Sequence, residues 1–401
     1  MVLNERLGLT GRLLPLWCMS LCCLLFAGPA LSGHVTVSSQ AQLIEQLNSA
    51  KPGTTIRLAP GTYRGGMHFS GLHGEKGKPI TVIAANPDNP PIIRGGSKCI
   101  QISSSSHLLL ESLVLERTTG NVLNIDDGGS IDQPTHHISL RKLTIRNKGV
   151  KGNLDGIKLS GITDFLIENC TIEDWGDGGS AIDMVGCHRG VIRNCNLKRT
   201  TNGATGIQCK GGTSGIRILQ CRFENAGMRH INLGGSTGRQ FFRPKLKDKG
   251  NAEARDLEVA GCTFVGPGVP VAFVGVDGAN VHHNTILHPS PWSTRILQET
   301  RGDDFIQCRD GQFTDNVIVF KQADLRRFVN VGPNTNPETF TFARNWWYCQ
   351  DAPGKSRPSL PANETDGVYG KDPKLDAAGM ATKQSPILGV AGAQAWEEAE
   401  K

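Results

Sequence analysis

The sequence predicts an all-β solenoid with parallel strands, and three observations indicate it. A short phrase of alternating apolar and polar residues recurs along the chain, and its nine copies are centred on Leu113, Leu143, Cys170, Cys195, Cys221, Cys262, Asn284, Asn316 and Asn345. Successive copies lie 30, 27, 25, 26, 41, 22, 32 and 29 residues apart. A second short strand lies between copies, and no intervening segment has helical periodicity. Such strands can pair only with their counterparts one period away, so the sheets are parallel.

The composition excludes several other classes. The 401 residues include 49 Gly and 21 Pro, too few and too irregular for collagen, and 38% are hydrophobic, which excludes a disordered polyelectrolyte. The net charge of +6 is small and evenly spread, so we expect no nucleic-acid partner. Length alone allows two or three domains, but the repeat indicates a single domain over residues 33–390.

Residues 1–32 have the pattern of an export signal. Arg6 and Arg12 precede an apolar run from Leu13 to Phe26, and small residues lead to an expected cleavage after Ser32. The run is short for a membrane span, and no later segment is long and apolar enough. The sequence therefore predicts a monomeric protein, without a membrane span, that is secreted or periplasmic.

Both ends of the solenoid need covers, since an open end leaves strand edges unpaired. Ser39 and Gln42 form a capping box for a short amphipathic helix, which we expect to close the N-terminal end within residues 35–50. From about Arg357 the chain is Pro-rich and irregular. We expect it to pack along or over the C-terminal end, with 391–401 a disordered end.

The cysteines of the repeat indicate a packed column. Nine cysteines remain after the export signal, an odd number without CxxC or zinc-type spacing, so neither a full disulfide framework nor a structural zinc site is expected. Stacking in parallel sheets would place Cys170, Cys195, Cys221 and Cys262 in one inward column about 4.8 Å apart. We expect Asn284, Asn316 and Asn345 to continue that column as a hydrogen-bonded ladder.

The second strand of each coil presents an outward position that is almost entirely polar. Its residues are Asn124, Lys158, Asp183, Gln208, Asn232, Phe273, Gln307 and Asn330. A long face of hydrogen-bonding groups suits an extended glycan, although any exposed strand face is polar. The 41-residue interval marks an insertion from Gly238 to Arg255, which we expect to line that face.

The opening and the tail of the chain carry a resemblance to known proteins. KPGTTIRLAPGTYRG from Lys51, GEKGKPITVIAANPDNPPII from Gly74, KDPKL from Lys371 and SPILG from Ser385 look like the corresponding parts of secreted polysaccharide lyases. With the coil phrases, the chain resembles right-handed parallel β-helix proteins of the pectate-lyase-like superfamily over residues 35–389. The resemblance implies a right-handed parallel β-helix with a short N-terminal capping helix.

Basic residues beside the polar face suit an acidic polysaccharide. Cleaving a uronate by β-elimination needs its carboxylate neutralised, a base for the C5 proton and an acid for the leaving oxygen. Lys158, Lys210 or Arg229 is the candidate base if its neighbours lower its pKa, and His230 is the candidate acid. The candidate substrate-binding residues are Asp183, Gln208, Asn232, Arg239 and Arg243. This reading predicts that Arg229→Ala or Lys158→Ala abolishes product and leaves thermal stability nearly unchanged.

Three alternatives remain open. Lys158 and Asp183 are one coil apart, and a plain surface salt bridge between them would fit a glycan-binding or structural protein without catalysis. The segment around Asp155, Asp177 and Asp183 is similar to the paired-Asp region of polygalacturonases, which are hydrolases, but their GHG and RIK elements are absent. Asp155 and Asp177 are also candidate ligands for Ca²⁺, which several lyases of the superfamily use.

Overall fold

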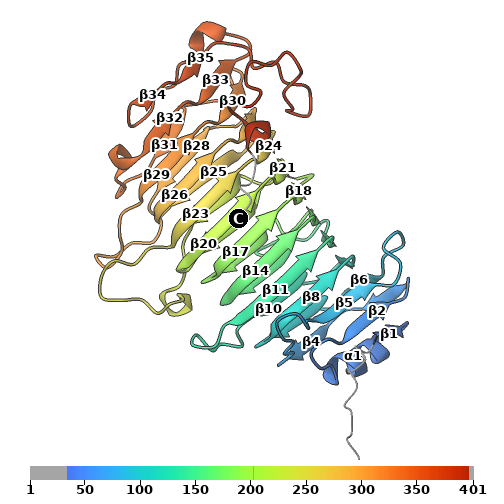
Figure 1. Ribbon diagram of the computed structural model, residues 1–401. Helices are drawn as coiled ribbons and strands as arrows, with labels where there is room; N and C mark the ends of the chain where they lie inside the picture. Colours follow the sequence, from blue (N-terminus) through green and yellow to red (C-terminus); the bar gives the residue numbers. More distant parts are fainter. Residues whose placement is uncertain (1–33, 202, 397–401) are drawn as a thin grey trace, which may run out of the picture. The chain divides into compact units, whose positions relative to one another are not determined.

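Three parallel sheets build the described part of the chain. The computed structural model describes residues 34–201 and 203–396, and these described residues form one compact unit. The export signal predicted for 1–32 lies outside the described residues. Strands of each sheet follow one another in chain order, coil upon coil (Figure 1).

Sheet A has thirteen strands. They are β1 (His34–Val37), β2 (Thr55–Leu58), β5 (Ile80–Ala84), β8 (Ser106–Glu111), β11 (Thr135–Arg141), β14 (Ile162–Glu168), β17 (His188–Arg193), β20 (Thr213–Leu219), β23 (Ala254–Ala260), β26 (Val276–His282), β29 (Arg309–Thr314), β32 (Thr341–Ala343) and β34 (Glu364–Thr365).

Sheet B has twelve strands. They are β3 (Thr62–Arg64), β6 (Ile92–Arg94), β9 (Val114–Glu116), β12 (Thr144–Arg146), β15 (Thr171–Glu173), β18 (Asn196–Lys198), β21 (Arg222–Glu224), β24 (Thr263–Val265), β27 (Thr285–Leu287), β30 (Val317–Phe320), β33 (Trp346–Cys349) and β35 (Val368–Tyr369).

Sheet C has ten strands. They are β4 (Met67–Ser70), β7 (Ile100–Ser103), β10 (Leu123–Asp126), β13 (Ile157–Ser160), β16 (Ser180–Val185), β19 (Thr205–Lys210), β22 (Arg229–Gly234), β25 (Val269–Val274), β28 (Thr294–Leu297) and β31 (Val329–Val331). The helical segments are α1 (Gln40–Asn48), η1 (Arg239–Phe241), η2 (Pro337–Thr339), η3 (Pro353–Lys355) and η4 (Ala393–Ala395).

Each coil runs from sheet C to sheet A to sheet B, so the repeated phrase contains two strands rather than one. A sharp corner divides the phrase, and the residue at the corner has a positive φ. These residues are Ser112, Lys142, Asn169, Asn194, Gln220, Gly261, His283, Asp315 and Arg344. The left-handed backbone turns the chain while the next residue points inward. The predicted parallel solenoid is confirmed, with this corner as the feature that the sequence pattern concealed.

The inward column at this corner forms as predicted. Cys170, Cys195, Cys221 and Cys262 are buried, and all nine cysteines of the described residues are free thiols. The backbone N–H of Cys262 donates to Oδ1 of Asn284 at 2.9 Å, and each following Asn accepts from the coil before it at 3.0 Å. The ladder ends where Asn345 donates to Glu364 at 2.8 Å. Every amide in it is therefore paired within the core.

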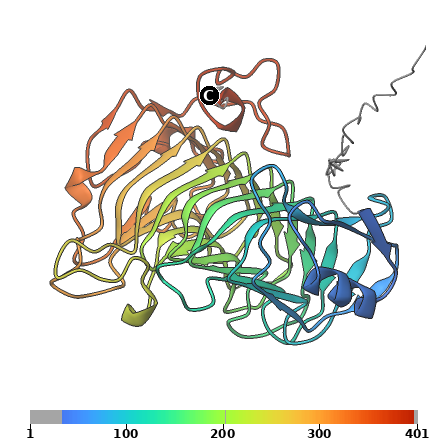
Figure 2. The same cartoon turned by 60° about the horizontal axis from the view of Figure 1, so that its bottom comes forward.

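The N-terminal cover is α1, at the blue end in both views (Figure 2). The side chain of Ser39 accepts from the backbone N–H of Gln42, and Gln42 accepts from the backbone N–H of Ser38. Leu43 and Leu47 are buried against the first coils. This end of the core is covered as the capping box predicts. Within the described residues, no helix is long and apolar enough to cross a membrane.

The C-terminal tail packs along sheet B. Ile387 and Ala391 join an apolar cluster with residues of β27, β30 and β33, and the backbone N–H of Gly392 donates to the carbonyl of Asp315. The prediction that disorder begins at 391 is therefore wrong as far as residue 396, because this apolar contact anchors the chain. Residues 397–401 lie outside the described part.

Candidate functional site

The outward face of sheet C carries the polar column. The strand register places in line Gln101, Asn124, Lys158, Asp183, Gln208, Asn232, Ala272, Arg295 and Asn330. Two predicted members differ. Phe273 points into the core and is buried, since Ala272 holds the outward position. Gln307 lies in the loop after β28, because β28 rather than the FIQCR segment supplies the sheet C strand of that coil.

A pocket of about 450 Å³ opens on this face between the sheet and the insertion. Lys158 of β13 and Lys210 of β19 line it from the sheet, and Phe241 and Arg243 line it from the insertion. Figure 2 shows the insertion leaving the stacked coils in yellow-green. The rigid sheet thus forms the floor of the pocket and the inserted loop forms its wall, as the position of the insertion predicts.

Two lysines and two aspartates form a charged cluster on the floor. Lys158 donates to Oδ2 of Asp183, and its Nζ lies 3.9 Å from Oδ2 of Asp155. Nζ of Lys210 lies 3.5 Å from Oδ1 of Asp183, an oxygen that accepts no hydrogen bond. Both aspartates are about 95% buried, whereas Lys210 keeps 18% of its side chain exposed. Lys158 keeps 22% exposed, so the two lysines, rather than the aspartates, face the pocket.

The environment raises the pKa of both Asp155 and Lys158, which favours a protonated carboxyl on the first and a charged ammonium on the second. Burial, and then the charge of Asp183, raise the pKa of Asp155 to about 6. Burial alone would lower the pKa of Lys158, but the carboxylates of Asp183 and Asp155 outweigh it and the net pKa is raised. The condition that neighbours lower its pKa is therefore not met for Lys158. This residue is a fixed cation rather than a base.

His230 lies inside the coil rather than on the face. Its side chain is 0% exposed and stacks against the rings of Phe223 and Phe264, with centroids 6.3 and 5.9 Å away. Gly268 on the next coil leaves the space, since a Cβ there would lie 2.7 Å from Nε2. Burial lowers the pKa of His230 to about 4. The prediction that His230 is the acid is wrong, because the chain still turns the corner into sheet C at this residue.

Arg229 also leaves the predicted arrangement. It pairs with Glu299 at 2.7 Å and donates to Oδ1 of Asn232 at 3.2 Å. It lines a separate pocket of about 580 Å³ together with Trp292 and Arg295. A guanidinium stays protonated at any ordinary pH, so Arg229 cannot serve as the base. Gln208 and Asn232 continue the polar column between the two pockets.

A clasp holds the wall of the first pocket to the sheet. Arg243 donates to both carboxylate oxygens of Asp127, which follows β10 and is 1% exposed. The side chain of Arg243 passes over Gly161 and Gly186. A Cβ atom added at Gly161 would lie 2.7 Å from Nε of Arg243, and one added at Gly186 would lie 2.4 Å from Cβ of Arg243. Small residues at these corners therefore make room for the clasp. Arg239, by contrast, pairs with Asp304 at 2.6 Å and does not line this pocket.

Glu253 anchors the other end of the insertion, and sequence reasoning missed it. This residue is 0% exposed and accepts hydrogen bonds from the backbone N–H groups of Gly211 and Thr237 at 2.8 and 2.9 Å. It also accepts from the hydroxyl of Thr300. The only available signal was a lone carboxylate between two neutral residues at the end of a charged loop.

The predicted calcium ligands do not fit a calcium site. Oδ1 of Asp155 accepts from the backbone N–H of Ser180 at 2.8 Å, and Oδ1 of Asp177 accepts from the backbone N–H of Gly152. The ammonium of Lys158 takes the place beside Asp155 and Asp183 that a cation would need. Among the described residues, neither Asp155 nor Asp177 belongs to a group of three potential ligands. The two aspartates shape separate turns, which also separates Asp177 from the pair that a polygalacturonase-like mechanism requires.

Comparison with known proteins agrees with the architecture. Residues 91–319 match the family described as the right handed beta helix region, and the chain belongs to this family. The fold is similar to an alginate lyase from Paenibacillus sp. str. FPU-7, with a TM-score of 0.52, 18% identity, and 83% of this chain and 95% of that chain covered. It is also similar to the pectate lyase Pel9A, with a TM-score of 0.51, 14% identity, and 87% and 89% covered.

A comparison with curated proteins gave no significant match. At these identities the structural likeness shows the fold alone. The structural neighbours are mostly polysaccharide lyases.

Proposed function

We propose that this protein is a polysaccharide lyase that cleaves an acidic, uronate-containing polysaccharide by β-elimination in the sheet C pocket. The observation that carries the proposal is the pair Lys158 and Lys210, which line the floor of an open pocket on either side of the buried Asp183, on three adjacent strands. Because the neighbours with this fold are mostly polysaccharide lyases, the fold is compatible with the reaction.

The charge of the pocket suits a carboxylated sugar. Lys158 is held as a cation by its two aspartates, and both Lys158 and Lys210 line the opening. An arriving uronate carboxylate would add a negative charge beside Asp155 and raise its pKa above about 6. With Lys210 neutral, proton uptake by Asp155 would then change the net charge of the four-residue cluster from −1 to zero, which removes a charge that would repel the substrate.

The chemistry assigns different roles to the two lysines. Lys158 neutralises the uronate carboxylate and makes the C5 proton more acidic. Lys210, in its neutral form, accepts that proton on Nζ while C4=C5 forms and the C4–O4 bond breaks with its electrons on O4. The proton then returns from Lys210 to O4. Using one residue in both steps fits the loss of His230 from the site.

The surrounding residues hold the sugar chain. Phe241, exposed at the rim, offers a ring face for stacking, while its neighbour Phe242 is buried. Gln208 and Asn232, on successive strands, extend the site across the strands, along the axis of the stack, toward Arg229 and Arg295. We further propose that the protein acts outside the cytoplasm, where such polysaccharides occur, as a single domain and a monomer.

A panel of polysaccharides tests the proposal. The purified protein is incubated with alginate, pectate, glycosaminoglycans and sulfated glycans, with and without Ca²⁺. Ultraviolet absorbance from unsaturated uronate ends on one acidic glycan is the expected result. Reducing ends without that absorbance would identify a hydrolase, and binding without any product would identify a non-catalytic glycan-binding protein; either result overturns the proposal.

A further inference from the structure

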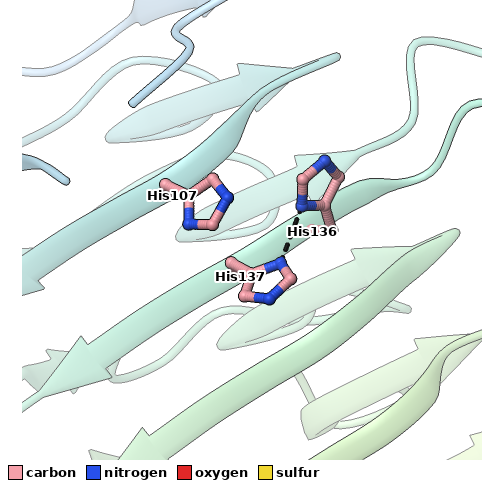
Figure 3. A group of neighbouring side chains, drawn as sticks. All are labelled: His107, His136 and His137. Atoms are coloured by element: carbon pink, nitrogen blue, oxygen red, sulfur yellow. Dashed lines mark hydrogen bonds between the residues drawn. The ribbon is translucent and has the colours of Figure 1, made fainter. Parts of the chain in front are cut away.

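Three histidines meet on sheet A, away from the floor of the sheet C pocket. His107 lies on β8, and His136 and His137 lie on β11 of the next coil (Figure 3). One nitrogen of each ring lies within 4.8 Å of the others, and this is the group of three potential metal ligands among the described residues. None of the three has a role in the proposed reaction.

The backbone explains why the rings meet. His107 and His137 have φ values of 51° and 56°, and both come one residue before paired strand residues, Leu108 and Ile138. The same left-handed step in neighbouring coils brings their side chains out together. His136, one residue earlier, approaches from the side, so the group depends on the coil geometry rather than on a flexible loop.

The rings are arranged around a shared space. His107 and His137 stack with centroids 4.3 Å apart, and His136 stands edge-on to both at 5.3 and 5.0 Å. Nδ1 of His136 lies 2.8 Å from Nδ1 of His137 (Figure 3). A tetrahedral ion 2.0–2.1 Å from each nitrogen separates its ligands by about 3.3 Å. The Nδ1 atoms of His136 and His137 need to part by about 0.5 Å to hold such an ion, and the ring of His107, which stacks on His137, needs to turn so that its lone pair points at the same ion.

The electrostatic surroundings favour neutral rings. Burial, and then the neighbouring rings, lower the pKa of His107 and His136. Asp164, Glu75 and His73 are the other titratable groups that act on these rings. Asp164 is itself paired with Arg189 at 2.7 Å.

We propose that His107, His136 and His137 bind one divalent transition-metal ion through three imidazole nitrogens, with a fourth position left for water. Imidazole nitrogen suits Zn²⁺, Co²⁺, Ni²⁺ and Cu²⁺, whereas Ca²⁺ and Mg²⁺ prefer oxygen. The site is separate from the proposed lyase pocket, and its existence does not depend on that function.

The chain contains a matched control. His282 and His283 repeat the adjacent pair on β26 and the corner after it, with Nδ1 atoms 3.0 Å apart and rings edge-on at 5.2 Å. His282 also lies 3.2 Å from Glu258. No third histidine joins them within the described residues. The metal affinity of the His282–His283 pair therefore shows how tightly two histidines bind an ion without a third imidazole.

The test is a metal titration of the untagged full chain after treatment with a chelator. Co²⁺ is followed by its visible absorbance and Zn²⁺ by competition against bound Co²⁺. We expect one equivalent in the wild type and in His283→Gln. In His107→Gln and in His137→Gln we expect at least about a tenfold weaker affinity. Removing a residue that hydrogen-bonds to a metal ligand already weakens metal binding by about tenfold or more, and removing the ligand itself should weaken it at least as much.

Thermal unfolding separates binding from misfolding. Zn²⁺ should raise the Tm of the wild type and of His283→Gln, because an ion that binds the folded state stabilises it, and should raise that of His107→Gln by less at the same Zn²⁺ concentration. Equal affinity in the wild type and His107→Gln, or no binding by the wild type, would overturn the proposal. An equal loss in His283→Gln would show that the metal binds elsewhere.

Discussion

The corner column inside the coils and the polar column on sheet C arise from the same stacking but have different chemistry. Inside, Cys170 to Asn345 are uncharged, and every Asn amide finds a partner one coil away. Outside, Lys158 and Asp183 are charged, and Oδ1 of Asp183 is left without a hydrogen bond. The polar groups of the inner column are all paired within the protein, whereas the outer column contains charged groups that can interact with a ligand.

Removing Lys158 should cause the largest loss of stability. Lys158→Ala leaves Asp155 and Asp183 buried without their cation, and breaking a buried ion pair costs about 3–5 kcal/mol. This replaces the expectation from sequence that stability would hardly change. Urea unfolding measures the loss. The triple variant with Asp155→Asn and Asp183→Asn should recover most of it, and a wild-type midpoint for Lys158→Ala alone would contradict the account.

Breaking the inner ladder should cost somewhat less. Asn316→Ala leaves the backbone N–H of Asn284 without its partner in the core and removes a donor to the carbonyl of Val281, which costs about 1–3 kcal/mol. Chemical denaturation gives the change in the free energy of unfolding. Cys195→Ala is the control in the same column, and we expect about 1 kcal/mol from it because it mainly removes packing. Equal losses would show that the hydrogen bonds of the ladder add nothing.

The titration of Asp155 should give a pH dependence of up to about 3 kcal/mol. Its pKa is raised from 3.8 to about 6, so the folded state binds more protons than the unfolded state between these values. The contribution of Asp155 to the free energy of unfolding is then largest below about pH 4, and it falls as the pH rises to about 6. Subtracting the curve of Asp155→Asn isolates this contribution. If the difference in the free energy of unfolding rises between about pH 4 and about pH 6, the pKa of Asp155 is lowered in the folded state rather than raised.

The sequence predicts the stack well because the register repeats. Once Cys170 and Cys195 are aligned, parallel pairing fixes which residues share a column, and Lys158, Asp183 and Gln208 fall in line as predicted. Phe273 was misplaced because the pattern of its coil is apolar on both faces.

The parts that failed depend on corners and loops. Alternation gives the direction of a side chain only within a strand, so it could not show that His230 turns inward at the start of β22. The clasp of Arg243 with Asp127 joins residues 116 positions apart through an irregular insertion. The histidine group was missed because His107 and His137 meet through positive φ values, which the repeat does not reveal.

The most direct test of the central claim compares Lys210→Ala with Lys198→Ala on the acidic glycan that the wild type degrades. Lys198 is a matched lysine on sheet B that pairs with Glu224 one coil away. We expect Lys210→Ala to form no detectable unsaturated uronate, while its Tm stays near that of the wild type, and Lys198→Ala to retain full activity. Unsaturated product from Lys210→Ala at the wild-type rate would contradict the assignment of the sheet C pocket as the active site.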